Sequence, residues 1–207
     1  MTILDTNENA LATSISSLDI EPVYNLINTV RDTKTLEGDN SIYSNAEVTI
    51  KTFDPNDLYP TAKYVLTSNL NFVSAMRTEV LESSGIDIFN LDRICETGPY
   101  VIAPPIVEIS DGVPAIVDGL HRCTLAKQLG KNISVIFVNG VDPTYPIIST
   151  PVDWKDVIQY DIKPEKADLL RNVRPGIADS SQSLRTYYRD FSYLGSLGRR
   201  PRAGQNS

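Results

Sequence analysis

The spacing of apolar residues predicts the first elements of the chain. Apolar and polar side chains alternate over residues 47–51, as in a strand with one buried face. Over residues 69–82 the apolar positions instead recur at helical spacing, and Gly85 provides a stop signal. The apolar face of this helix is predicted to carry Leu70, Val73, Met76, Val80 and Leu81.

A β-hairpin is predicted next. Residues 105–109 and 113–117 have the composition of strands, and Ser110-Asp111-Gly112 between them is a tight-turn signal. Because Pro114 has no backbone N–H, its strand should lie at a sheet edge or contain a bulge. A short helix over residues 120–129 follows and should end at Gly130.

Residues 133–138 are almost continuously apolar, which indicates a strand buried on both faces. Strands and helices therefore mix around a small sheet. This order predicts an α+β fold for one domain, over about residues 46–140.

The flanking segments are predicted to differ from this domain. Residues 1–45 are polar and should form a flexible arm with at most one helix, around the apolar patch at 23–27. Residues 141–194 are predicted to form a helical extension, with helices over 164–171 and 181–191. Residues 195–207 have the composition of a disordered basic tail.

Candidate chemistry centres on the turn between the second hairpin strand and the helix. Gly119 permits a tight turn, and the free N–H groups of the following helix start favour an anion. Arg122 adds a forked cation suited to phosphate, and His121 adds a donor that can also move protons. Asp118 at the strand end is suited to hold Mg²⁺ or to deprotonate a hydroxyl. Catalytic roles are therefore assigned to Asp118 and His121.

Plainer alternatives exist for the same residues. Asp118 could cap the helix of an ordinary turn, and Arg122 could pair with Glu108 or Asp111 to hold the hairpin. Cys123 suits a packing role in the helix, and Thr124 is either an extra phosphate donor or an ordinary surface residue.

Residues 105–138, with Asp118-Gly-Leu-His-Arg122 at their centre, resemble the ParB/sulfiredoxin superfamily. The resemblance implies a small mixed sheet with flanking helices. It also implies that the turn and helix start hold nucleotide phosphates. Members include CTP-binding partition proteins, sulfiredoxins, free-serine kinases and domains labelled as nucleases. The implied nucleotide-binding residues are Gly119, Leu120, His121, Arg122, Cys123 and Thr124.

Three departures separate the chain from particular members. Sulfiredoxins carry a reactive Cys where this chain has Leu120, and partition proteins usually have a second Arg where it has Cys123. The serine kinases share an acid matching Asp118 and a Pro-Thr matching residues 60–61, but they typically continue with a Glu where this chain has Ala62. These kinases are the nearest enzyme type.

The expected function is therefore binding of a nucleoside triphosphate, ATP or CTP, with Mg²⁺ held by Asp118. Phosphoryl transfer to a small hydroxylated acceptor, or nucleotide hydrolysis, would follow. The alternatives are a non-catalytic nucleotide sensor and a ParB-like nuclease or DNA clamp.

Charge bears on the choice of partner. The formal net charge is -7, but residues 166–207 carry +5 and residues 1–165 therefore carry -12. An acidic body repels nucleic acid, so any DNA binding should be weak and should use Arg199, Arg200 and Arg202 in the tail. Short apolar runs and an acidic N-terminus predict no membrane segment, no signal peptide and a cytoplasmic location. Two Cys and one His do not suggest a disulfide framework or a zinc site.

Overall fold

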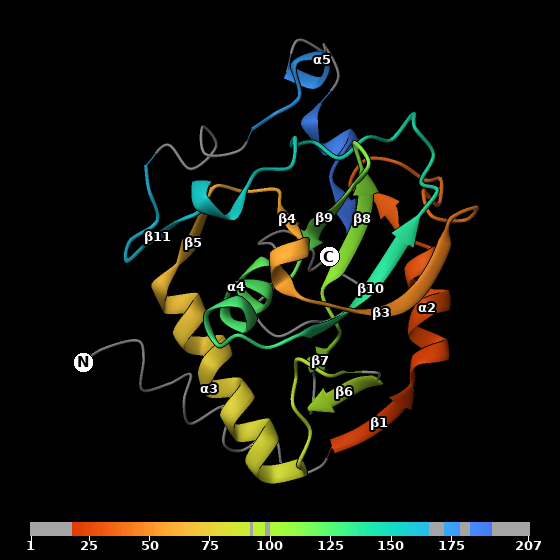
Figure 1. Ribbon diagram of the computed structural model, residues 1–207. Helices are drawn as coiled ribbons and strands as arrows, with labels where there is room; N and C mark the ends of the chain where they lie inside the picture. Colours follow the sequence, from red (N-terminus) through yellow and green to blue (C-terminus); the bar gives the residue numbers. More distant parts are fainter. Residues whose placement is uncertain (1–17, 92, 98–99, 166–171, 179–182, 192–207) are drawn as a thin grey trace, which may run out of the picture.

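A five-stranded mixed sheet forms the centre of the computed structural model (Figure 1). The structure describes residues 18–91, 93–97, 100–165, 172–178 and 183–191. The strand order is β3-β10-β8-β9-β4. These strands are β3 (Glu47–Phe53), β4 (Tyr59–Pro60), β8 (Ile106–Ser110), β9 (Val113–Asp118) and β10 (Ile133–Asn139).

The pairing within this sheet is both parallel and antiparallel. β10 runs antiparallel to β3 and parallel to β8, β8 and β9 form the predicted hairpin, and β4 runs parallel to β9. The hairpin turn uses positive φ at Asp111 (53°) and Gly112 (78°), as its sequence predicts. Pro114 faces β8 outside the two-residue pairing of β9 with β4, so its missing N–H removes no bond to β4.

Helices cover both faces of the sheet, and the alternation along β10 explains how. Ile133, Val135 and Phe137 point into a core shared with α3 (Thr67–Ser84) and α4 (Leu120–Gln128). The intervening Ile136 and Val138 point into a second core under α2 (Val23–Arg31). The prediction of a strand buried on both faces is therefore confirmed, as is the α+β class.

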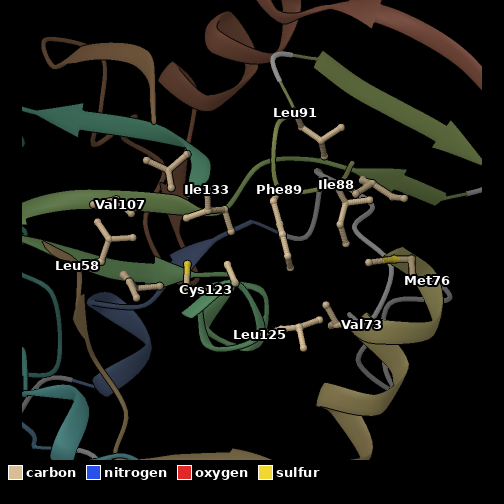
Figure 2. Packing of buried hydrophobic residues seen from close by; sticks show 14 of the residues in the cluster. Leu58, Val73, Met76, Ile88, Phe89, Leu91, Val107, Cys123, Leu125 and Ile133 are labelled. Atoms are coloured by element: carbon tan, nitrogen blue, oxygen red, sulfur yellow. The ribbon is translucent and has the colours of Figure 1, made fainter. Parts of the chain in front are cut away.

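The first core joins the two helices that border the candidate turn. Leu125 of α4 points toward Val73 of α3, and Cys123 lies against the sheet near Val107 (Figure 2). The predicted helix at 69–82 is present, and Gly85 ends it at φ 72°. Leu81 departs from the prediction because its side chain is 38% exposed, at the edge of the buried face.

The smaller elements lie around this framework. β1 (Leu18–Pro22), β6 (Arg93–Thr97) and β7 (Tyr100–Ile102) form one sheet, and β5 (Tyr64–Leu66) pairs with β11 (Ile158–Tyr160). β2 (Lys34–Thr35) pairs with β12 (Arg189–Asp190). Within the described residues, the remaining elements are the 3-10 turns η1 (Pro55–Asp57), η2 (Trp154–Asp156) and η4 (Leu184–Thr186), and the short helix α5 (Pro175–Ala178).

The segment before residue 46 is packed where the sequence suggested a flexible arm. Its expected helix is α2, whose Leu26 and Val30 are almost fully buried. Ile42 and Tyr43 also enter the second core. Since α2 covers one face of the sheet, the packed fold begins before the predicted boundary at residue 46. Residues 1–17 lie outside the described residues.

The C-terminal extension differs from its helical prediction in the part that the structure describes. Residues 184–186 form a 3-10 turn capped by the Ser183 side chain, and residues 189–190 form strand β12 instead of continuing a helix. The apolar spacing over 181–191 was misleading because tertiary contacts hold Arg189 in extended backbone. The predicted helix over 164–171 and the tail after residue 194 fall largely or wholly outside the described residues.

A buried ion pair and an Arg–Asp pair connect the C-terminal extension to the β8–β9 hairpin. Arg189 donates from Nε and Nη2 to the two carboxylate oxygens of Glu108 on β8, each at 2.8 Å. Tyr43 donates its hydroxyl to the same carboxylate. Arg174 holds the hairpin turn through Asp111 at 2.6 Å. Neither Glu108 nor Asp111 therefore takes Arg122 as its partner, and that alternative from the sequence is wrong.

Candidate functional site

The candidate turn lies where strand β9 passes into helix α4. Gly119 is the N-cap residue of α4 and adopts left-handed backbone with φ 83°. A Cβ at this position would lie 2.7 Å from Cβ of Pro105, so both the backbone and the available space require glycine. The cap residue makes no side-chain capping bond. The helix start is thus formed as the sequence predicts.

The start of α3 meets the start of α4 at this turn. The backbone N–H of Leu66, the N-cap residue of α3, donates to Nε2 of His121 at 3.2 Å. The side-chain amide nitrogen of Asn69 lies 3.4 Å from the same ring nitrogen. Neither Leu66 nor Gly119 carries a side-chain acceptor, so neither can cap its helix in the usual way. The two positive helix ends therefore converge on His121.

The chemistry of His121 follows from this contact. Burial lowers the pKa of His121, so the ring is neutral at neutral pH. Since Nε2 accepts from Leu66, the ring proton of the neutral form lies on Nδ1. His121 thus joins the two helix starts as a neutral acceptor and retains one donor, at Nδ1.

Arg122 is turned into the protein. Its side chain is 10% exposed, and Nη1 donates to the carbonyl oxygen of Ala103. Its Nη2 lies 3.8 Å from Oδ2 of Asp118, four residues earlier. The guanidinium therefore supports the turn from its buried side and places a positive charge beside the Asp118 carboxylate at the end of β9.

The other predicted residues of the helix start have different surroundings. Cys123 is fully buried, and burial raises the pKa of its thiol to about 12. A thiol of this kind is inert as a nucleophile. Cys123 therefore does not replace the reactive Cys that sulfiredoxins carry at the position of Leu120. Thr124 donates its hydroxyl to the carbonyl of Leu120 at 2.8 Å, and Leu120 itself packs partly against the first core.

The Pro-Thr pair noted in the sequence lies beside Asp118. Pro60 of β4 is paired in parallel with Ile116 of β9, and Thr61 donates its hydroxyl to the carbonyl of Ile116 at 2.7 Å. The carboxyl ends of both strands therefore meet at one edge of the sheet, next to the two helix starts. Ala62 follows at the position where a Glu was expected from the kinase resemblance.

Sequence reasoning missed the contribution of α3 to this site. Leu66, Thr67 and Asn69 lie more than 50 residues before His121, and no local signal links them to the turn. The one indication came from the resemblance to the serine kinases, which share a Pro-Thr pair before this helix. Thr67 also reaches the C-terminal side, where its hydroxyl donates to the carboxylate of Asp161 at 2.7 Å.

Of two hollows in the described surface, one borders this site. The larger, of 520 Å³, lies beside the loop after β10 and is lined by none of the predicted site residues. The smaller, of 400 Å³, includes Thr124 of α4. Within the described residues, no three Asp, Glu, His or Cys side chains are grouped as a metal site, and no helix could cross a membrane.

Comparison with known proteins gives the family. No curated protein and no solved structure matches the chain. The family model described as the ParB CE domain matches residues 25–158. The match runs from α2 to the start of β11 and so contains the central sheet, both helix starts and the candidate turn. Because the match covers more than half of the chain, the protein belongs to the ParB CE domain family.

Proposed function

We propose that this protein binds the phosphates of a nucleoside triphosphate where the first turns of α3 and α4 meet. The observation that carries the proposal is the bond from the Leu66 N–H to His121 Nε2, which brings the two uncapped helix starts together. The first N–H groups of each helix lack partners within the helix, and each start carries partial positive charge. A polyphosphate supplies the acceptor oxygens that such a site lacks.

Each residue of the turn has its own role in the proposed phosphate site. Gly119 permits the left-handed backbone that begins α4, and His121 offers Nδ1–H as a side-chain donor. Arg122 contributes its charge from beneath the turn. Thr124 lies one helical turn further on, where its side chain is buried and its hydroxyl donates to the carbonyl of Leu120.

For turnover, the proposal assigns Asp118. Mg²⁺ is commonly held by one or two carboxylates together with substrate phosphates, and Asp118 is a single carboxylate at the edge where the phosphates would lie. With the metal bound, the charge on the transferring phosphoryl group would be neutralised. Asp118 is also placed to accept the proton of a small hydroxylated acceptor, or of water in hydrolysis.

A nucleotide sensor without turnover is the second candidate. It is favoured by the pairing of Asp118 with Arg122, which engages the carboxylate in a structural contact. Asp118→Asn separates the two functions. In an enzyme, release of ADP or phosphate in the presence of hydroxylated acceptors collapses in this variant while nucleotide binding survives. In a sensor, the wild type shows no release to lose.

The phosphate site is tested by adding one negative charge. In Asn69→Asp, a carboxylate enters the space between the two helix starts, where it repels phosphate but favours the N-terminus of α3. We expect calorimetric titration with inorganic tripolyphosphate and with Mg-ATP to show about tenfold weaker binding or more, equivalent to about 1.4 kcal/mol. The melting temperature should stay unchanged or rise.

The matched control is Asn132→Asp, which makes the same charge change at an exposed position between α4 and β10. It should leave both affinities unchanged. The proposal fails if the wild type does not bind tripolyphosphate, or if Asn69→Asp binds it as tightly as the wild type does.

A further inference from the structure

The smaller hollow adjoins the proposed phosphate site and has the size of a small-molecule pocket. Its volume is about 400 Å³. Apolar side chains come from β5 and from the segment around η2, and amide side chains come from α4 and β11. The lining residues are Val65, Thr124, Lys127, Gln128, Trp154, Val157 and Gln159.

The hollow and the helix start share one face of α4. His121, Thr124 and Gln128 are spaced i, i+3 and i+7, so they lie along one side of the helix. At 1.5 Å of rise per residue, Gln128 lies about 10 Å along the axis from His121. A ligand whose phosphates lie at His121 and which continues along this face therefore reaches the hollow.

A chain of hydrogen bonds orients the amide side chains of the hollow. The Asp161 carboxylate only accepts, so the Thr67 hydroxyl must donate to it, at 2.7 Å. Thr67 Oγ1 then accepts from Gln159 Nε2 at 3.0 Å. This places Gln159 Oε1 toward Gln128 Nε2, at 3.4 Å. Gln128 is left with its carbonyl oxygen and one N–H for a ligand, side by side and in a fixed order.

We propose that this hollow takes the base of the bound nucleotide, and that the base is adenine. The inference rests on the phosphate site proposed above. A Gln side chain pairs with adenine through its N6 donor and N7 acceptor, and Gln128 presents the complementary acceptor and donor. Val157 and the Trp154 ring, both half-buried, supply apolar surface for the base.

The position of Gln128 distinguishes a base from an acceptor substrate. The hydroxyl of an acceptor must lie about 3–3.5 Å from the phosphorus that it attacks. Gln128 lies too far along α4 from the phosphate site for that contact, whereas the ribose of a nucleotide separates its base from its phosphates. The hollow therefore suits the base, and the acceptor belongs near Asp118.

Trp154 makes the proposal directly measurable, because it is the chain's single tryptophan. Its indole N–H donates to the carbonyl of Pro55 at 2.7 Å, and Lys127 Nζ lies 5.7 Å from its ring centroid. We expect Mg-ATP to change tryptophan emission with the same midpoint as in calorimetry. Tripolyphosphate should bind without changing the emission, since it has no base.

The variant Gln128→Ala should weaken Mg-ATP binding about tenfold, as expected for loss of a two-bond contact to a base, and leave tripolyphosphate affinity unchanged. The neighbouring Leu129→Ala, at an exposed residue outside the hollow, is the control and should alter neither. GTP should bind more weakly than ATP to the wild type and equally to Gln128→Ala.

The outcomes separate this inference from the proposed function. If tripolyphosphate binds but Gln128→Ala keeps full ATP affinity, or if ATP binds without any change in tryptophan emission, the adenine pocket is refuted and the phosphate site stands. If tripolyphosphate does not bind, the phosphate site is refuted. Adenosine alone would then still support the pocket if it changed the emission of the wild type but not that of Gln128→Ala.

Discussion

The buried ion pair between Arg189 and Glu108 gives the sharpest prediction about what holds the fold together. Their side chains are 4% and 2% exposed, and Arg189 also donates to the carbonyl oxygens of Tyr145 (2.7 Å), Tyr187 (3.0 Å) and Pro146 (3.2 Å). In Arg189→Met these three carbonyls and the carboxylate each lose their bonds from the guanidinium. Removing one partner of such a pair costs about 3–5 kcal/mol, because a buried charge is left uncompensated.

Urea unfolding measures this cost. We expect Arg189→Met to lower the free energy of unfolding by about 3–5 kcal/mol, a large part of the 5–15 kcal/mol typical of a domain. The control is Arg185→Met, which removes the same cation from an exposed pair with Glu37. Its side chains are 54% and 41% exposed, and such pairs contribute at most about 1 kcal/mol.

A double-mutant cycle shows whether the uncompensated charge is the cause. Since Glu108→Leu removes the carboxylate, adding it to Arg189→Met should recover part of the lost stability. Tyr43 remains a donor in the wild type because burial, together with Glu108, raises the pKa of its hydroxyl. The reasoning is refuted if Arg189→Met costs less than about 1 kcal/mol, or if the effects of the two substitutions simply add.

Three further predictions concern the site and the charge distribution. Because burial lowers the pKa of His121, the unfolded chain binds more protons below about pH 6.5, so stability should fall as pH drops from there toward the folded pKa. His121→Gln should flatten this slope in urea midpoints measured from pH 7.5 to about 5.5, and an unchanged slope would contradict the assignment. With its pKa raised to about 12, native Cys123 should resist alkylation that goes to completion in urea, as followed by peptide mass spectrometry. The protein with its tail should bind duplex DNA weakly and only at low salt, and deletion of residues 195–207 should abolish this binding. DNA binding at physiological salt without the tail would favour the hypothesis of a clamp or nuclease.

Local signals in the sequence predicted the elements that local interactions determine. Gly85 ends α3 and Gly119 begins α4, each in the left-handed region, and the hairpin turn needs positive φ at both residues before Val113. The continuous apolar run of β10 was also sufficient to predict a strand buried on both faces. In each case the deciding property belongs to the residues themselves.

Contacts between distant residues explain what the sequence did not reveal. Arg189 lies 81 residues from Glu108, and their ion pair holds residues 189–190 in a strand despite helical apolar spacing. The same limitation concealed the burial of α2, whose polar surroundings suggested an arm. No periodicity or motif encodes which buried charge will meet which partner, because that depends on the completed sheet.

In the candidate turn, residues 118–122, local signals again predicted the backbone, whereas contacts with distant residues determine the surroundings of the side chains. The sequence of the turn correctly predicted a glycine-bounded helix start, and Arg122, which it proposed as a phosphate ligand, also donates from Nη1 to the carbonyl of Ala103. His121 in turn binds the start of α3. A turn motif therefore specifies a backbone conformation and a local charge, whereas the donors that face a ligand depend on the second helix that packs beside it. For this chain that makes Asn69 a more informative residue to change than the arginine of the motif, because its substitution alters the site without removing a buried support.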